Sequence, residues 1–172
     1  MNEIIILYLL SSGQNTMYGI AKTLFKLYGS MTKPSFGTIQ PAFKRLENQK
    51  FIKSDKFITD GGKPYYYFSI TDEGSSFLRE KLLSDITENP TQFITEAKIR
   101  ISCSDILSKE EKSELFKKII LSLSKIKTEA ETTLKSGVFE SNFAGKMILD
   151  NTVCEYKNLL ELVERIKNAC NS

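Results

Sequence analysis

The sequence predicts a mainly α-helical protein with one small β-hairpin, and three observations lead to this fold class. Apolar residues make up 41% of the 172 residues and recur at helical spacing in several segments. The residues Asp60-Gly61-Gly62-Lys63 separate two runs that alternate like strands, which is a strong hairpin signal. The segment before them reads as a basic helix. A basic helix that leads into such a hairpin is typical of a winged helix-turn-helix, in which the hairpin is the wing.

The first two helices are predicted before residue 30. Residues 2–11 form an apolar first helix, and residues 12–15 form a turn. Thr16 is a plausible N-cap for a second helix that runs to Tyr28. Its apolar side chains are expected on one stripe, which holds Tyr18, Ala21, Leu24, Phe25 and Tyr28. Gly29 is expected to end this helix in the left-handed conformation.

The third helix, which we call the recognition helix, is expected to be capped by Ser35 or Thr38. Proline is best tolerated in the first turn of a helix, so Pro41 favours a start near residues 37–38 or a locally irregular first turn. A core stripe is expected at Ile39, Phe43 and Leu46.

Paired strands are predicted over residues 51–58 and 64–70, with Gly61 and Gly62 turning the hairpin at positive φ. Thr71 is expected to cap a fourth helix over residues 72–87. Asn89-Pro90 is a boundary signal. We therefore predict a winged helix-turn-helix DNA-binding domain in residues 1–88.

Residues 89–172 are predicted to form an antiparallel helical dimerisation domain, with helices near residues 91–105, 109–136 and 142–170. Ser108 and Glu111 form a capping box at the start of the middle helix. Apolar residues of the last helix recur at nearly heptad spacing, and we expect them to bury against a second subunit. These predicted dimerisation residues are Leu149, Val153, Tyr156, Leu160 and Val163. A monomeric helical subdomain is the alternative.

Charge is unevenly distributed along the chain. Residues 16–69 hold nine Lys or Arg against three acidic residues, whereas the whole chain has a net charge of +3. A local basic excess is the electrostatic pattern expected of a nucleic-acid-binding face. A solvated basic surface without a partner is the alternative, and the order of helix and wing favours the first interpretation.

The composition argues against an enzyme. The chain has no histidine and no Gly-rich phosphate loop, and its paired glutamates lie among lysines as on a solvated helix face. We expect no catalytic residue, no metal and no cofactor. Cys103, Cys154 and Cys170 match no zinc or redox spacing, so free thiols are expected. No apolar run is long enough to cross a membrane, and a cytoplasmic location is the expectation.

These motifs resemble the PadR family of transcriptional regulators. Members carry Tyr-Gly early in the second helix, as in Tyr18-Gly19, and a Pro-Ser-x-Gly-Thr-Ile-Tyr-Pro motif, which residues 34–41 match except at Gln40. Gly61, Gly62, Tyr66, Thr71 and Gly74 fit the family's wing frame. The C-terminal part resembles the long helical form shared with the virulence-activator type. The resemblance implies a homodimeric repressor, sometimes an activator, that binds a pseudo-palindromic operator on double-stranded DNA.

Some relatives release DNA when a small aromatic or cationic compound binds, so the resemblance also implies a small-molecule effector. One known ligand platform uses tryptophan, which this chain lacks. Phe93, Phe116 and Phe143 lie at helical spacing and are expected in the core.

Three departures from the family pattern concern DNA binding and the core. Gln40 replaces tyrosine, and glutamine can still donate to phosphate or read an adenine edge. Phe43 replaces leucine in the core, and the wing carries one basic residue instead of two or three. Arg45 is expected to lean toward the wing as an ion-pair partner. The predicted DNA-binding residues are Lys33, Ser35, Thr38, Gln40, Pro41, Lys44, Arg45, Lys63 and Tyr65.

The leading interpretation of the sequence is therefore a sequence-specific DNA-binding transcriptional regulator. The alternative is a winged-helix interaction module, such as an anti-repressor or scaffold, that uses the same fold without DNA.

Overall fold

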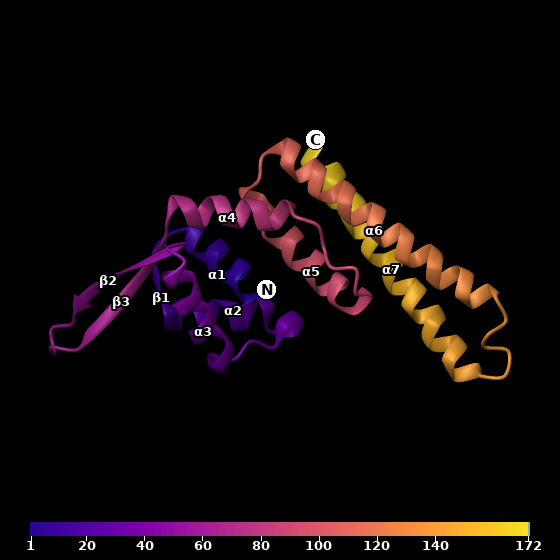
Figure 1. The fold of residues 1–172 in the computed structure, drawn as a ribbon, viewed down its shortest axis with the longest axis horizontal. Helices are drawn as coiled ribbons and strands as arrows, with labels where there is room; N and C mark the ends of the chain where they lie inside the picture. Colours follow the sequence, from indigo (N-terminus) through magenta and orange to yellow (C-terminus); the bar gives the residue numbers. More distant parts are fainter. Residues whose placement is uncertain (172) are drawn as a thin grey trace. The chain divides into compact units, whose positions relative to one another are not determined.

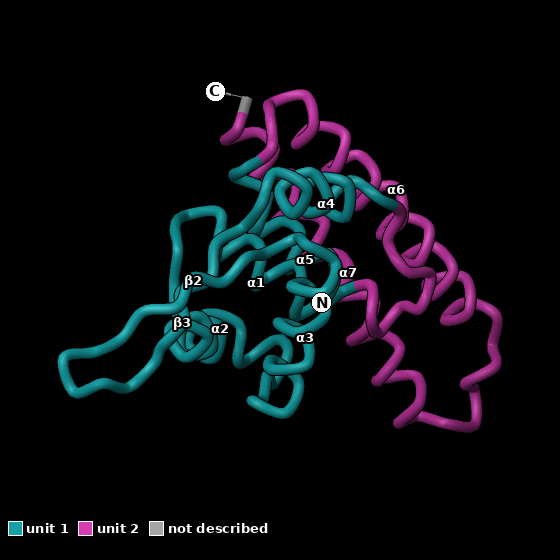
Figure 2. Tube along the Cα trace, turned by 60° about the vertical axis from the view of Figure 1, so that its left-hand side comes forward, with its two compact units in different colours: residues 1–84, 94–106 teal, residues 85–93, 107–172 magenta. Residues whose placement is uncertain are grey.

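The computed structural model of the protein describes residues 1–171 and divides the chain into two compact units. The first unit combines residues 1–84 with residues 94–106, and the second combines residues 85–93 with the residues from 107 onward (Figure 2). The predicted division at residue 88 concerns which part binds DNA and which part pairs subunits, and it stays a prediction. The mainly helical winged fold with a helical C-terminal part is confirmed.

The first unit is a helical bundle with a small sheet at one side, from which a long hairpin projects (Figure 1). Its elements are α1 (Asn2–Ser11), β1 (Asn15–Thr16), α2 (Met17–Thr32), α3 (Phe36–Asn48), β2 (Ile52–Ile58), β3 (Pro64–Ile70), α4 (Asp72–Leu83), the later residues of α5 (Pro90–Ser102) and the short 3-10 helix Ser104–Ile106. The sheet is antiparallel in the order β1-β3-β2.

The core of the first unit is built around α1, which explains why α1 is apolar on all sides. Ile5, Ile6 and Leu7 are fully buried, and α1 contacts α2, α3, α4 and β3. The predicted stripe of α3 is buried as expected, and the Phe43 ring meets the Phe68 ring edge-on, with centroids 4.9 Å apart. This packing fixes which face of α3 remains exposed.

The short strand β1 was missed by the sequence analysis, which predicted a turn and a two-stranded hairpin. Asn15 pairs with Phe68 and Thr16 with Tyr67. A strand of two residues is too short to show alternation, so the sequence carries no signal for it. Thr16 still caps α2, because its hydroxyl accepts a hydrogen bond from the Gly19 amide at 3.0 Å.

Two helix ends differ from the prediction. Gly29 does not end α2, which continues to Thr32 and is closed by Lys33 in the left-handed conformation (φ 41°). The amide of Lys33 donates to the Gly29 carbonyl, so a lysine fills the position usually taken by glycine. The fourth helix ends at Leu83 rather than at residue 87, and Ser84 lies outside it in an extended conformation.

The recognition helix α3 begins at Phe36, with Ser35 as its N-cap. Both candidate capping residues take part, because the Thr38 hydroxyl accepts a hydrogen bond from the Ser35 amide at 3.2 Å. The earlier start places Pro41 inside the helix rather than in its first turn, which corrects the predicted start near residues 37–38. Pro41 has no N–H to give to the Gly37 carbonyl, and this is tolerated because Gly37 is exposed to water.

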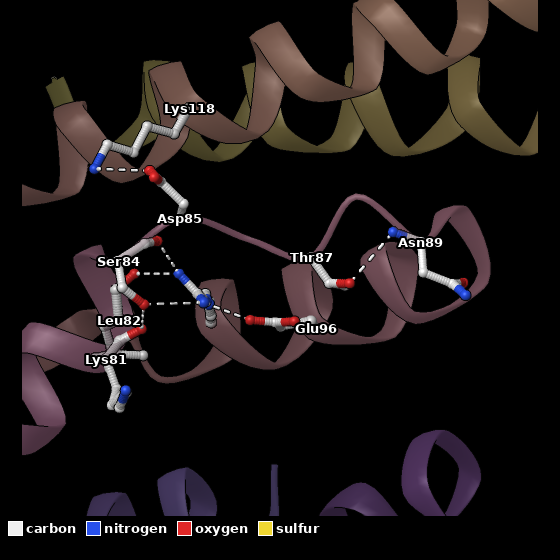
Figure 3. A network of polar contacts seen from close by, with 9 residues as sticks. Lys81, Leu82, Ser84, Asp85, Thr87, Asn89, Glu96 and Lys118 are labelled. Carbon is white, nitrogen blue, oxygen red and sulfur yellow. Dashed lines mark hydrogen bonds and ion pairs between the residues drawn. The ribbon is translucent and has the colours of Figure 1, made fainter.

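A buried arginine joins the end of α4 to α5 within the first unit. Arg100 is 3% exposed, and its guanidinium donates to the carbonyls of Leu82 and Ser84 and to the Ser84 hydroxyl. It also pairs with Glu96, one turn earlier on α5. The contacts of this network are drawn around Ser84 and Glu96 in Figure 3. A cation at the C-terminus of α4 satisfies carbonyls that the helix leaves without an internal partner.

The second unit contains an antiparallel pair of long helices, α6 (Lys109–Lys135) and α7 (Phe143–Asn171) (Figure 1). The predicted capping box is confirmed: the Ser108 amide donates to the Glu111 carboxylate at 2.7 Å, and the Glu111 amide donates to the Ser108 hydroxyl. Phe93 and Phe116 are buried as predicted, but Phe143 is 77% exposed. Phe143 is the first residue of α7, where helical spacing does not ensure burial.

Candidate nucleic-acid interface

The outer face of the recognition helix carries several of the predicted DNA-binding residues. Ile39, Phe43 and Leu46 point into the core, so the opposite side of α3 is presented to solvent. Gln40, Pro41 and Lys44 are exposed on this side. Amide and ammonium groups on an exposed helical face can donate to phosphates and to base edges.

Arg45 lies on one edge of this face, and its ion pair corrects the sequence prediction. Its Nε lies 2.6 Å from a Glu3 carboxylate oxygen, so Arg45 leans toward α1 and not toward the wing. The residue that faces the wing is Glu47, whose carboxylate accepts a hydrogen bond from the Ser54 hydroxyl at 2.6 Å. Glu47 was assigned no such role from the sequence.

Thr38 also lies on the α1 side of the recognition helix. Its hydroxyl receives a hydrogen bond from the Asn2 amide at 3.1 Å in addition to its role in the capping box. Thr38 and Arg45 border an open cavity at the start of α1, together with Met1, Asn2, Glu3, Gly37 and Pro41. The structure therefore separates the candidates on α3 into two groups: Thr38 and Arg45 make contacts with α1, whereas Gln40 and Lys44 face outward.

The segment before the recognition helix presents two further predicted residues. Lys33 is exposed and lies in the left-handed conformation at the end of α2. Ser35 is exposed at the N-cap of α3, next to the positive end of the helix dipole. An anion can approach both groups from the same end of α3.

The wing is formed by β2 and β3, which pair from Ile52 opposite Ile70 to Ile58 opposite Pro64. At its tip Gly62 has a φ of +76°, as predicted, but Gly61 does not lie in the left-handed region, which corrects that part of the prediction. Lys63 is exposed beside this tip. Its backbone amide donates to the Thr59 hydroxyl at 3.1 Å.

Aromatic rings cover one face of the wing. Tyr65 stacks on Phe57 across the strands with ring centroids 5.7 Å apart, and it meets Tyr67 edge-on at the same distance. Tyr65 is thus only partly free to contact another molecule. Tyr66 points to the opposite face, pairs in register with Lys56 and is 45% exposed. Because successive side chains of a strand point to opposite faces, the sequence could have placed Tyr65 and Tyr66 on different faces of β3.

A second aromatic group, at the start of the recognition helix, was missed by the sequence analysis. Phe36 stacks against Tyr18 with ring centroids 6.4 Å apart and planes at 13°, and it meets Phe25 edge-on at 5.6 Å. Tyr18 is 69% exposed and Phe36 is 49% exposed. The sequence analysis had placed Tyr18 and Phe25 on the core stripe of the second helix. We call Tyr18, Phe25 and Phe36 the aromatic platform.

In the second unit the predicted dimerisation residues do not share one environment. Val153, Tyr156 and Val163 are buried within the single chain, where α7 packs on α6. Leu149 and Leu160 are half-buried. The large apolar side chains exposed on α7 are Phe143, Met147, Ile148 and Leu162.

Over residues 1–171, no group of three or more acidic, cysteine or histidine side chains could hold a metal ion. No helix among these residues is both long and apolar enough to cross a membrane. Cys103, Cys154 and Cys170 are free thiols, as predicted. Cys103 is buried, and burial raises the pKa of its thiol to about 11.

Comparison with known families is consistent with this arrangement. Residues 6–80 match the model of the transcriptional regulator PadR-like family. A search of curated proteins gives no match. Among solved structures, a PadR-like transcriptional regulator from Bacillus cereus is 31% identical, with 45% of this chain and 74% of that chain covered and a TM-score of 0.39.

Two further structures illustrate the range of similarity. A PadR family transcription regulator from Clostridium difficile is 30% identical, with 46% of this chain and 81% of that chain covered and a TM-score of 0.41. Bacillus subtilis PadR in complex with operator DNA is 20% identical, with 98% of each chain covered and a TM-score of 0.45.

Proposed function

Because this chain belongs to the PadR-like family of transcriptional regulators, we propose that it is a homodimeric repressor that binds a pseudo-palindromic operator. The single observation that carries the DNA-binding part is the outer face of α3, where Gln40 and Lys44 are exposed while Ile39, Phe43 and Leu46 hold the helix on the core. A recognition helix presented in this way can enter the major groove.

Each predicted contact residue has a role in this proposal. Lys44 meets a phosphate, and Gln40 reads an adenine edge or donates to a phosphate. The DNA backbone on either side of the recognition helix is contacted by Lys33, Ser35 and Lys63. Apolar contact with the DNA is added by Tyr65 and Pro41. Thr38 acts through α1, because its contact with Asn2 positions the recognition helix. The ion pair with Glu3 holds Arg45 at the edge of the surface that meets DNA.

The experiment that tests DNA binding is a titration of the protein with random duplex DNA, followed by selection of a preferred sequence. We expect binding to random duplex to weaken steeply with salt, because phosphate contacts release counterions. Selected duplexes should bind at least a thousandfold more tightly than random duplexes. If no duplex binds at low salt, the chain is an interaction module such as an anti-repressor or scaffold.

A dimer is part of the proposal because helix-turn-helix dimers place two recognition helices about 34–36 Å apart on DNA. We place the subunit contact on α7. The exposed Met147, Ile148 and Leu162 face the partner, while Val153, Tyr156 and Val163 form the core between α6 and α7 and the half-buried Leu149 and Leu160 lie on the side of that core. Large apolar side chains that are exposed on a long helix favour association with a second copy.

Sedimentation tests the dimer. Ile148 is 69% exposed, so Ile148→Asp should leave the α6–α7 pair folded and convert the dimer to a monomer. Val138 has the same 69% exposure but lies in the turn between the helices, so Val138→Asp is the matched control and should remain dimeric. A wild-type monomer at tens of micromolar would contradict the dimer and leave the DNA-binding proposal standing.

An effector site is the last part of the proposal. The second unit has a cavity of about 220 Å³, in which Phe93 and Ile126 supply apolar surface. Two carboxylates, from Glu88 and Glu129, outnumber the one ammonium group, from Lys125. These groups suit a small aromatic cation better than an aromatic anion. Benzylamine should therefore raise the melting temperature more than benzoate does, and Glu129→Gln should remove the difference. Equal shifts for both probes would argue against this site.

A further inference from the structure

The aromatic platform leaves two large rings exposed to solvent, those of Tyr18 and Phe36. Phe36 is the first residue of α3 and Tyr18 the second residue of α2, and their rings stack with centroids 6.4 Å apart. Phe25 supports Phe36 from one edge at 5.6 Å and is itself half-buried. The platform is therefore held in place from below, while the outer rings remain open to solvent.

The position of the platform on α3 links it to the outer face of the recognition helix. Phe36 and Gln40 are four residues apart and thus lie on the same side of α3, one turn from each other. Lys22 lies between Tyr18 and Phe25 on the same side of α2, and it is exposed. An apolar surface next to an amide and an ammonium group is suited to the edge of a DNA groove.

The chemistry of the major groove identifies what such a surface would contact. Thymine is the one base that presents an apolar group there, its C5 methyl, and glutamine is suited to adenine. We propose that the aromatic platform, through Phe36, contacts thymine methyl groups and makes this chain select A·T pairs at the start of the recognition helix. This inference rests on the proposed DNA binding and specifies the sequence feature that it reads.

The test uses deoxyuridine, which pairs like thymidine but lacks the methyl group. Each thymine of a duplex selected by the full-length protein is replaced in turn by uracil, and the affinity is measured at fixed salt. Loss of one contacted methyl should weaken binding about fourfold, the effect of removing one buried methyl group. Most thymines should show no effect, because only those under the platform are contacted.

A coupling measurement assigns the effect to Phe36. The Phe36→Ala variant should bind duplexes with uracil at the sensitive positions as tightly as duplexes with thymine there, because the methyl group has lost its contact. Leu27 is also exposed and apolar, but it lies on the opposite side of α2 from Tyr18, so Leu27→Ala should keep the full fourfold effect. Circular dichroism of both variants checks that the winged helix remains folded.

Two results would overturn the inference while leaving the proposed function intact. One is a selected duplex in which no uracil replacement weakens binding by more than twofold. The other is a methyl effect that persists unchanged in Phe36→Ala. If no duplex binds, the proposed function itself fails and this inference fails with it, which is a distinct and recognisable outcome.

Discussion

Glu3 and Arg45 join the first helix to the recognition helix, with the carboxylate oxygen 2.6 Å from the guanidinium Nε. The Arg45 side chain is 59% exposed, so water screens the pair and its effect on stability is small. We expect the pair to have a larger effect on DNA binding. The pair holds one basic side chain against an acid at the edge of the surface proposed to meet DNA.

We expect Glu3→Gln to strengthen binding to random duplex DNA. The change removes a negative charge from this edge and releases Arg45 to meet a phosphate, which should steepen the salt dependence by about one unit. The free energy of unfolding should change by less than about 1 kcal/mol. Glu164→Gln removes one exposed charge from α7 and should leave DNA affinity unchanged. Weaker binding in Glu3→Gln would instead show that the pair positions the recognition helix.

The two glycines at the wing tip should respond differently to alanine. Gly62 has a φ of +76°, and a Cβ there meets no atom within 4 Å, so Gly62→Ala is strained by backbone conformation alone. We expect a loss of about 1 kcal/mol, seen as faster amide exchange of Thr59, whose N–H bonds the Lys63 carbonyl. Gly61→Ala is the control and should exchange like the wild type. Equal exchange in both variants would contradict the turn geometry.

Arg100 should contribute strongly to the stability of the first unit. Arg100→Met removes a buried cation that bonds the Leu82 and Ser84 carbonyls and pairs with Glu96, and we expect a loss of about 3 kcal/mol in urea unfolding. Arg165 is exposed on α7, so Arg165→Met should change stability by no more than about 0.5 kcal/mol. Similar values for the two variants would show that the buried network is replaceable by apolar packing.

The buried thiol of Cys103 predicts a loss of stability in alkali. Burial raises its pKa to about 11, from an ordinary value of 9.0, so the folded chain keeps a proton that the unfolded chain releases. The stabilisation is complete below pH 9 and is lost as the pH rises through 11, by about 3 kcal/mol at most. Cys103→Ala should flatten this decline, measured by urea unfolding at pH 8 and pH 10.5. An equally steep decline would assign it to other groups, such as Tyr8, whose pKa burial raises to about 12.

Much of the fold could be predicted from local patterns. The hairpin tip at Gly61-Gly62, the capping box at Ser108 and the stripe of Ile39, Phe43 and Leu46 are signals within a few residues of each other. Contacts between distant segments carry no such signal. The pairing of Asn15 with Phe68 and of Arg45 with Glu3 depends on the tertiary fold, which single-sequence periodicity does not encode.

For the same reason, only part of the candidate site could be predicted from the sequence. Exposure of Gln40 and Lys44 followed from helical periodicity once the core stripe was known. The exposure of the aromatic platform did not follow from periodicity, because apolar rings at helical spacing favour a core assignment. For this reason Tyr18 is predicted on the core stripe of the second helix. Its stacking on Phe36 joins two helices and becomes visible only in three dimensions.

We propose that the outer face of the recognition helix binds the DNA backbone through Lys44. The most direct measurement is the slope of log affinity against log salt for random duplex DNA, compared between wild type, Lys44→Ala and Lys117→Ala. Lys117 is exposed on α6, so its variant removes the same charge from the other unit. We predict that Lys44→Ala lowers the slope by about one unit and that Lys117→Ala leaves it unchanged. Equal slopes in all three proteins would show that Lys44 does not contact the DNA backbone.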